Sequence, residues 1–443
     1  MSHISYQHPE VERLDRGEIL AIQRRKLATL GRRLANSPDW VAHFRSAGMS
    51  PGDLTDHRAL AAAPTMEKAD LRRLYPFPML TVAMSEVRRF IATSGTTGLP
   101  VMFGLTERDL NHLIPYQMCR ILRTIGIVSG DRVYQGFGYG LWVGGLAMDI
   151  GLNAYGAVNF SLGPGRGELA AEWLRDHGYT ACTMSPLWLM TLISTARELG
   201  IDPRRDWKLR VGLFGGQSIS AAFHDQLEDA MPAGFAAYNN YGTTEAGGPV
   251  VSVSCPHSHE RDEMHLINED TIITEVVDPA TMAPIGPGEV GEIVITTLER
   301  DASPVVRWRT RDLVRLSDHP YDCPCGRIGL PLIGRIIGRN DDMLKVRGVI
   351  VFPTQIEDII ANTEGTVKEA WHIHIDREDK VLEEITVEME RARGCNLAND
   401  DLAKRVQHAI HSRIGIRAAV ICRDEGTLPR YEAKAVRVHV KKS

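Results

Sequence analysis

Short apolar runs alternate with longer segments of helical periodicity through the first two thirds of the chain. The runs at 179–184 and 209–214 have the length of buried strands, and segments with helical spacing follow them at 187–199 and 219–230. This alternation is typical of an α/β domain, in which helices cover the faces of a sheet. Leucines spaced among Arg and Lys along residues 17–47 predict a helical stripe near the start.

After residue 338 the pattern becomes that of a compact α+β module. A helix, two strands with apolar faces of period two, a second helix and a last strand at 418–422 follow one another. Such a module is small enough to move as a rigid unit. His372 and His374 alternate on the polar side of the first strand, where we expect them to be exposed, and we assign them no role.

Between these regions, strand patterns around 270–279 and 289–298 follow one another without helices, which predicts a β subdomain. The predicted fold is therefore α/β. It has a large N-terminal α/β domain with a β subdomain over 1–338 and a small mobile C-terminal α+β domain over 339–443.

The composition is that of an ordinary globular protein. The chain has 443 residues, of which 43% are hydrophobic and 24% charged, and its net charge of −5 argues against nucleic acid as a partner. No stretch approaches the apolar length that spans a bilayer, and the start carries no secretory signal, so we expect a cytoplasmic protein without a membrane partner. Seven cysteines are too few and too scattered for a secreted disulfide framework.

The loop Thr-Ser-Gly-Thr-Thr-Gly-Leu-Pro at 93–100 follows an apolar strand-like run. Its glycines let backbone N–H groups approach phosphate oxygens, and its hydroxyl groups donate further hydrogen bonds to the same anion. It is not a Walker loop, because no Gly-Lys-Ser/Thr follows. The loop predicts a triphosphate site, and a solvated turn is the alternative.

Further motifs offer the other groups that a nucleotide site needs. The run Tyr-Gly-Thr-Thr-Glu at 241–245 combines a ring, a hydroxyl and a carboxylate, which suit a purine, an α-phosphate and Mg²⁺. Asp312 could accept hydrogen bonds from both ribose hydroxyls, 338–348 is a charged linker, and Lys434 lies near the end of the small domain. Taken one by one, Glu245 and Asp312 could equally form surface ion pairs.

A Cys-Pro-Cys loop at 323–325 and the segment 255–265, which begins with cysteine and contains three histidines, indicate a metal site. Three thiolates and one imidazole form a closed tetrahedral zinc site if the two segments meet in space, and unrelated loop cysteines are the alternative. The ligands that we predict are Cys255, His265, Cys323 and Cys325. His265 is favoured because an apolar pair follows it and would anchor the ring, while His257 and His259 stay open as replacements.

In this order the motifs resemble the adenylate-forming superfamily of acyl-CoA synthetases, and within it the phenylacetate-CoA ligase family. The resemblance covers almost the whole chain and includes the segments 68–77, 214–216 and 347–353. It implies an N-terminal adenylation domain, a C-terminal domain that rotates, and an enzyme that uses ATP, Mg²⁺ and coenzyme A. The cysteines also look like the zinc ligands of part of that family, which implies a structural Zn²⁺.

The resemblance assigns roles residue by residue. The implied ATP-binding residues are Ser94, Gly95, Thr96, Thr97, Gly98, Gly215, Gly216, Gln217, Asn239, Asn240, Tyr241, Asp312 and Arg339. The implied catalytic residues are Lys434, which bridges the acyl carboxylate and the α-phosphate, Thr244, and Glu245, which binds magnesium. Asp341 is the implied hinge. The residues expected to line the acyl pocket are Phe137, Tyr139, Gly140, Trp142, Phe214 and Tyr238.

The implied reaction has two halves, formation of an acyl-adenylate with release of pyrophosphate, and displacement of AMP by the thiol of coenzyme A. The rings of the acyl pocket favour a flat aromatic acid, and the amide of Asn239 favours an amino- or hydroxybenzoate, with phenylacetate second. Transfer to a carrier-protein thiol or another nucleophile is one alternative, and a non-catalytic nucleotide-binding protein is the other. A homodimer is left open.

Overall fold

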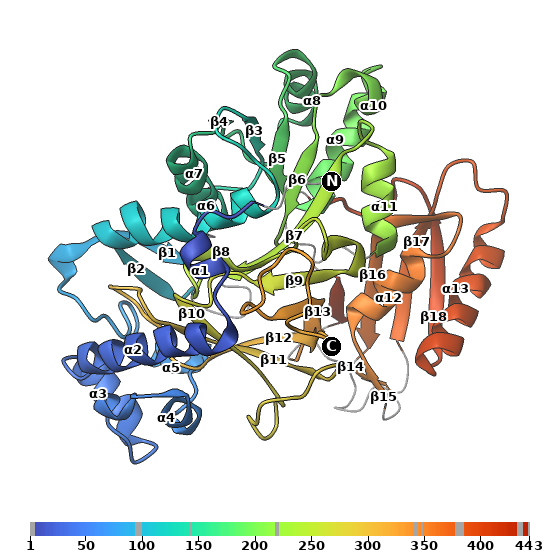
Figure 1. The fold of residues 1–443 in the computed structure, drawn as a ribbon. Helices are drawn as coiled ribbons and strands as arrows, with labels where there is room; N and C mark the ends of the chain where they lie inside the picture. The colour runs from blue at the N-terminus through green and yellow to red at the C-terminus, as the bar shows by residue number, and fades with distance from the viewer. Residues whose placement is uncertain are drawn as a thin grey trace.

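The computed structural model describes residues 5–93, 100–140, 143–217, 221–340, 344–346, 349–376, 385–431 and 437–441. Figure 1 shows a large N-terminal part built on one long sheet and a smaller C-terminal part beside it with a sheet of its own. The buried apolar side chains of the C-terminal part form a cluster separate from those of the N-terminal part. Each part therefore has its own core.

One half of the long sheet is parallel and carries helices between its strands. Its strands are β3 (Arg132–Gln135), β4 (Val158–Phe160), β5 (Ala181–Met184), β6 (Val211–Phe214) and β7 (Ala236–Thr243). The helices between them are α7 (Gly144–Tyr155), α8 (Gly167–Asp176), α9 (Pro186–Glu198), α10 (Pro203–Asp206) and α11 (Ala221–Asp229). Every residue of β5 and β6 is buried, which explains why their sequences are apolar runs rather than alternating patterns.

The other half of the sheet is antiparallel, and its strands follow one another as β10-β11-β12-β13-β9-β8 before β7. The strands are β8 (Gly248–Val253), β9 (Glu263–Leu266), β10 (Ile272–Val277), β11 (Val290–Thr297), β12 (Trp308–Leu316) and β13 (Leu332–Arg339). This half contains the predicted β subdomain. Because β7 pairs with β8, it continues the same sheet instead of forming a separate one.

Helices and a hairpin from the N-terminal residues complete the large part. The helices are α1 (Pro9–Glu12), α2 (Arg16–Leu34), α3 (Pro38–Arg45), α4 (His57–Ala62), α5 (Lys68–Arg73) and α6 (Ile114–Thr124), and the hairpin strands are β1 (Val87–Ala92) and β2 (Met102–Thr106). The predicted stripe at 17–47 forms two helices, because Ser37 is extended and Pro38 starts α3. None of the helices that the structure describes is long and apolar enough to cross a bilayer.

The C-terminal part has the α+β architecture that the sequence predicts. A hairpin of β14 (Leu344–Val346) and β15 (Val349–Val351) precedes α12 (Pro353–Ala361), and α13 (Asn399–Ile414) follows later. The sheet has the order β18-β17-β16-β19. Its strands are β16 (Thr366–Asp376), β17 (Ile385–Arg391), β18 (Ala418–Asp424) and β19 (Val438–Lys441). The apolar faces of β16 and β17 are buried, as their period-two patterns predict.

Two expectations for this part are wrong. The strand at 418–422 is not the last one, because β19 follows it and pairs parallel with β16; a four-residue strand gives little signal in the sequence. His372 is also not exposed, since only 5% of it is accessible. Burial, together with the nearby His439 and Arg437, lowers the pKa of His372 to about 4, so its imidazole is neutral near pH 7.

Candidate active site and metal centre

The predicted adenine-binding residues meet where the parallel strands β6 and β7 end. A Cβ at Gly215 would lie 3.1 Å from the backbone oxygen of Asn240 and 3.7 Å from Cζ of Phe137, so glycine keeps this surface open beside an aromatic ring. Asn240 donates through Nδ2 to the carbonyls of Pro249 and Ser252, at 3.0 and 2.7 Å. Its buried Oδ1 accepts no hydrogen bond from the described residues. A fixed amide therefore keeps an acceptor available at a strand end, where ligands of α/β folds commonly bind.

Tyr241 and Asp312 join the two halves of the sheet. The hydroxyl of Tyr241, on β7, donates to Oδ2 of Asp312, on β12, at 2.7 Å. Arg339, at the end of β13, is the register partner of Asp312 and places Nη1 3.3 Å from Oδ1. Each carboxylate oxygen of Asp312 thus has a fixed partner, which holds the group in one orientation.

Glu245 lies in the turn after β7 with only 6% of it accessible, and Thr244 beside it is also buried. Burial, together with the charge of Asp312, raises the pKa of Glu245 above its usual value, while Lys68 opposes the shift. The buried Arg300 places Nη1 3.5 Å from the backbone oxygen of Glu245. A carboxylate that is poorly solvated in this way is stabilised by a cation.

The motifs in the sequence do not predict Lys68 or Arg300 as site residues. Lys68 lies in a segment that resembles the family, so a signal for it was available. Arg300 lies 55 residues from Glu245 in the chain, and a single sequence does not reveal that the two approach each other. Gln217, three residues after the end of β6, is half-buried. The backbone N–H of Asn239 donates to Oγ of Ser254 at 2.8 Å.

Gln135 organises the loop predicted to line the acyl pocket. Its side chain accepts from the backbone N–H of Phe137 and donates through Nε2 to the hydroxyl of Tyr139 at 2.9 Å. A cavity of about 120 Å³ opens beside this loop. The residues that line it come from β1, β2, the loop and α7, and are Arg89, Phe90, Ile91, Ala92, Met102, Tyr139, Gly140 and Leu146. Two of the predicted acyl-pocket residues, Tyr139 and Gly140, therefore line one cavity.

Two other predicted acyl-pocket residues do not lie together. Phe214 pairs with Asn239 and Leu213 pairs with Tyr238 across β6 and β7, so Phe214 and Tyr238 lie on opposite faces of the sheet. Phe214 packs in the apolar core on one face, whereas the ring of Tyr238 lies 5.2 Å from that of His259. The period-two pattern of these strands could have separated the two residues.

Several predicted residues lie outside those that the structure describes. They are Ser94, Gly95, Thr96, Thr97, Gly98, Trp142, Asp341 and Lys434.

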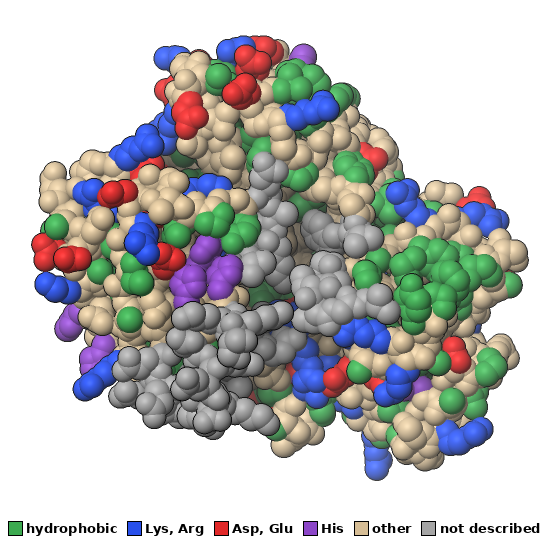
Figure 2. All heavy atoms as spheres, turned by 180° about the vertical axis from the view of Figure 1, so that it is seen from behind, with side chains coloured by type: hydrophobic (Ala, Val, Ile, Leu, Met, Phe, Trp, Pro, Cys, Tyr) green, Lys and Arg blue, Asp and Glu red, His purple; other side chains and the backbone are tan. Residues whose placement is uncertain are grey.

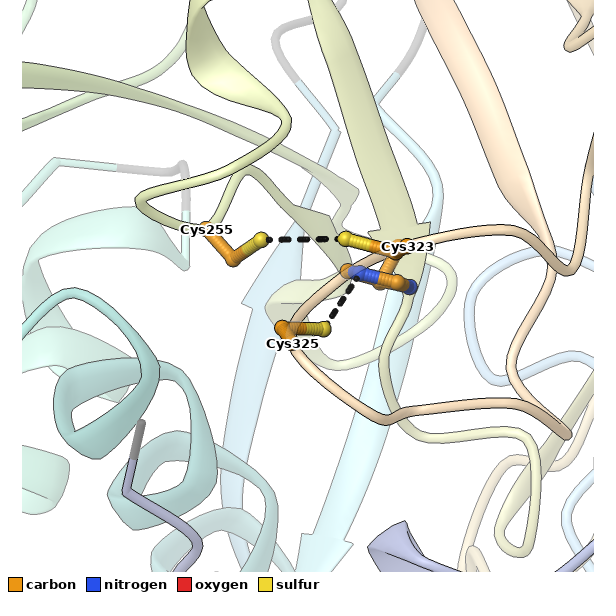
Figure 3. A group of neighbouring side chains, drawn as sticks. Cys255, Cys323 and Cys325 are labelled. Atoms are coloured by element: carbon orange, nitrogen blue, oxygen red, sulfur yellow. Dashed lines mark hydrogen bonds between the residues drawn. The ribbon is translucent and has the colours of Figure 1, made fainter. Parts of the chain in front are cut away.

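The two cysteine segments meet, as the zinc prediction requires. One ligand atom each of Cys255, His265, Cys323 and Cys325 lies within 4.8 Å of the others, and all four residues are buried. Figure 3 shows Cys255 facing Cys323, with Cys325 close by on the same loop as Cys323. Sγ of Cys255 lies 3.7 Å from Sγ of Cys323, and Sγ of Cys325 lies 3.2 Å from Nε2 of His265.

His265 is held so that one ring nitrogen faces the sulfur atoms. Its Nδ1 lies 3.1 Å from the carbonyl oxygen of Leu330, which fixes the orientation of the ring. Burial opposes a charge on this imidazole, but the sulfur atoms of Cys255 and Cys325 outweigh it and raise the pKa of His265 to about 9. Buried thiolates that attract positive charge are a donor set that suits Zn²⁺. His257 and His259 are not part of this group.

Comparisons with known proteins agree with the fold and the motifs. A family model described as AMP-binding enzyme matches residues 45–298, and one described as AMP-binding enzyme C-terminal domain matches residues 348–442. Phenylacetate-coenzyme A ligase of Pseudomonas putida is 35% identical over 411 residues, which cover 92% of this chain and 90% of the relative. Phenylacetate-coenzyme A ligase of Escherichia coli K12 is 34% identical over 427 residues, covering 95% and 94%.

A solved structure has the same architecture throughout. 2-Hydroxyisobutyryl-CoA ligase in the postadenylation state, in complex with 2-HIB-AMP, superposes with a TM-score of 0.88 at 26% identity, covering 98% of this chain and 92% of its own. The same protein in the thioesterification state with coenzyme A gives a TM-score of 0.71 at the same coverage. From its sequence, fold and motifs, the chain belongs to the phenylacetate-coenzyme A ligase family of AMP-binding enzymes, ligases that activate a carboxylic acid with ATP and pass it to coenzyme A.

Proposed function

We propose that this protein activates an aryl carboxylic acid with ATP to an acyl-adenylate and pyrophosphate, and then transfers the aryl group to the thiol of coenzyme A with release of AMP. The observation that carries the proposal is a pair of contacts: Gly215, just after β6, lies against Asn240 on β7, and Tyr241 on β7 is bonded to Asp312 on β12. We propose the cytoplasm as its location, because ATP and coenzyme A are available there.

In this proposal the strand ends bind the nucleoside. Adenine lies between Tyr241 and the glycines at 215 and 216. The Oδ1 of Asn240, which has no donor among the residues that the structure describes, accepts from the amino group of adenine, since a buried acceptor left without a donor is costly. Asp312, held by Tyr241 and supported by Arg339, binds the ribose hydroxyls. The loop 94–98 binds the β- and γ-phosphates.

The reacting phosphate lies beside buried charge. Thr244 donates to the α-phosphate, and Glu245 would hold Mg²⁺, which supplies positive charge to the phosphates when bound. Glu245 fits this role because its carboxylate is buried with a raised pKa, a state that a cation relieves. Lys434 contacts the acyl carboxylate and the α-phosphate, where negative charge develops in the transition state.

Rotation of the C-terminal part separates the two half-reactions. The TM-score against one relative falls from 0.88 in the postadenylation state to 0.71 in the thioesterification state, which supports two arrangements of the same two parts. We place the boundary between 338 and 339 and the hinge at Asp341. The present arrangement resembles the first state, and rotation would remove Lys434 from the phosphate.

The acid binds beside the loop that Gln135 organises. Tyr139 and Gly140 line the cavity of about 120 Å³ and offer an aromatic ring and an unobstructed backbone to a flat substrate. Gln135 and the hydroxyl of Tyr139, which are hydrogen-bonded to each other, are polar groups of the loop beside this cavity. We therefore propose an amino- or hydroxybenzoate as the acid, with phenylacetate as the second choice.

The cysteine cluster has a structural role in this proposal. Zn²⁺ is bound by Cys255, His265, Cys323 and Cys325. It connects the loop between β12 and β13 to β9 and to the segment before β9. A closed site with four protein ligands leaves no position for a substrate, so the metal contributes to stability and not to the reaction.

Purified protein should be incubated with ATP, magnesium and coenzyme A plus each acid of a panel, while AMP and the thioester are followed by mass spectrometry. The panel holds amino- and hydroxybenzoates, benzoate, phenylacetate and a medium-chain fatty acid. We expect the highest kcat/KM for a ring-substituted benzoate. Preference for the fatty acid would refute the aryl substrate, and preference for phenylacetate would refute the polar substituent. AMP formation that requires a carrier-protein thiol in place of coenzyme A would select the alternative acceptor. A homodimer stays a prediction.

A further inference from the structure

Three histidines and a glutamate gather on the polar face of the C-terminal sheet. His372 and His374 lie on β16, His439 is the register partner of His374 on β19, and Glu388 is the register partner of His372 on β17. Helices α12 and α13 pack on the other face of these strands, with the apolar core. Figure 2 shows histidine side chains grouped on the rear face of the C-terminal part, which agrees with this placement.

The distances within this group are those of metal ligands. One ligand atom each of His372, His374 and Glu388 lies within 4.8 Å of the others. Nε2 of His374 is 2.9 Å from Oε2 of Glu388. Two ligands bonded at right angles to one ion, each at about 2.1 Å, are about 3 Å apart, so this pair already has the spacing of neighbouring ligands.

His439 lies next to these three residues but outside the group whose ligand atoms come within 4.8 Å of one another. Its ring centre lies 4.5 Å from that of His372 and 5.5 Å from that of His374. Its Nε2 is buried and has no hydrogen-bond partner in the part of the chain that the structure describes. A buried ring nitrogen without a partner is unfavourable, and a bound ion would satisfy it.

The donor set selects the class of ion. Imidazole nitrogens with one carboxylate suit Zn²⁺, Ni²⁺ and Cu²⁺, whereas Mg²⁺ and Ca²⁺ prefer oxygen ligands. Arg423 competes for the carboxylate, because its Nε donates to Oε1 of Glu388 at 2.7 Å. The hydroxyl of Tyr431 lies 3.1 Å from Nε2 of His372, so an ion at that nitrogen would replace this contact.

We propose that His372, His374 and Glu388, with His439 as the fourth ligand, form a divalent transition-metal site on the C-terminal sheet. It is separate from the cysteine cluster, and it does not depend on the reaction proposed above.

Nickel binding to the full chain tests this site directly. Protein loaded with a single equivalent of zinc, the amount that the cysteine cluster holds and that elemental analysis confirms, is titrated with NiCl₂ in a calorimeter at neutral pH. We expect one saturable equivalent of Ni²⁺, and an affinity at least about tenfold weaker in His374→Ala and in His439→Ala, since a lost ligand bond costs more than about 1.4 kcal/mol. His408→Ala is the matched control, because His408 is an exposed histidine on α13 of the same part and should leave binding unchanged.

A variant that should bind Ni²⁺ more tightly distinguishes the loss of a ligand from misfolding. The side chain of Arg423 is 49% exposed, so Arg423→Ala should leave the fold intact, release Glu388 and tighten Ni²⁺ binding. An unchanged affinity in this variant would remove Glu388 from the ligands. Absence of saturable binding in the zinc-loaded protein, or equal weakening by His374→Ala and His408→Ala, would overturn the site.

Discussion

The hydroxyl of Tyr241 and the carboxylate of Asp312 are joined by a hydrogen bond of 2.7 Å across 71 residues of sequence. Burial, followed by the charge of Asp312, raises the pKa of Tyr241 well above its usual value, so the hydroxyl stays protonated and continues to donate. The bond connects the parallel half of the sheet to the antiparallel half. The orientation of the proposed ribose-binding carboxylate therefore depends on how the two halves pair.

Replacement of Asp312 should weaken ATP binding. Hydrogen bonds to a charged group contribute about 1.5–3 kcal/mol, so Asp312→Ala should raise the KM for ATP by at least about tenfold. Steady-state kinetics at saturating acid and coenzyme A measure the effect. Asp318→Ala removes an exposed carboxylate just after β12 and serves as the control. An unchanged KM for ATP would show that Asp312 does not bind the ribose.

Lys434 should serve adenylation alone. Loss of one preorganised charge contact costs about 10²-fold or more, so Lys434→Ala should slow acyl-adenylate formation by that factor. Thioester formation from supplied acyl-adenylate should persist, because the rotated C-terminal part presents another face. Rapid-quench assays of each half-reaction measure the two rates, with Lys404→Ala, an exposed lysine on α13, as the control. Equal loss of both half-reactions is the result that the rotation model cannot accommodate.

The cysteine cluster should carry zinc. Elemental analysis of protein purified without chelator should show that Cys323→Ser and His265→Ala each lose one equivalent relative to the wild type, while His257→Ala does not. Both ligand variants should also melt several degrees lower, because a metal bound only by the folded state stabilises it. Zinc that is retained in His265→Ala but lost in His257→Ala would move the fourth ligand.

An ion pair across the proposed domain boundary should favour the adenylation arrangement. Nη2 of Arg335, on β13, lies 2.5 Å from Oδ2 of Asp358, on α12. Partly exposed pairs contribute at most about 1 kcal/mol, so Asp358→Asn should slow adenylation by up to about fivefold and spare thioester formation. The two half-reaction rates are compared with those of Asp401→Asn, a change at an exposed carboxylate of α13. Equal slowing of both half-reactions would mean that the pair only stabilises the fold.

Local patterns in the sequence predict much of this fold. The apolar runs at β5 and β6 and the period-two faces of β16 and β17 are buried as predicted, because burial on one or both faces fixes the residue pattern directly. The strand β19 was missed because four residues give too little periodicity. His372 was placed at the surface because its burial depends on β19, which brings His439 against it.

The candidate site likewise has contacts that the sequence predicts and contacts that it does not. Cys255 and the Cys-Pro-Cys loop could be matched as one ligand set by residue type alone, and the structure brings them together with His265. The Tyr241–Asp312 bond and the approach of Arg300 to Glu245 join segments 71 and 55 residues apart in the chain, and no local pattern of one sequence encodes such contacts. Phe214 and Tyr238 were grouped by residue type, although their strand positions place them on opposite faces.

The central claim, activation of an aryl acid through an acyl-adenylate before transfer to coenzyme A, is tested most directly by isotope transfer. The preferred acid of the panel, labelled with ¹⁸O at both carboxylate oxygens, is incubated with ATP, magnesium, coenzyme A and the protein, and the AMP and thioester are analysed by mass spectrometry. Attack of the carboxylate on the α-phosphorus predicts one ¹⁸O atom in each AMP formed and one AMP for each aryl thioester. AMP without the label, or a thioester formed with ADP and phosphate, would contradict the account.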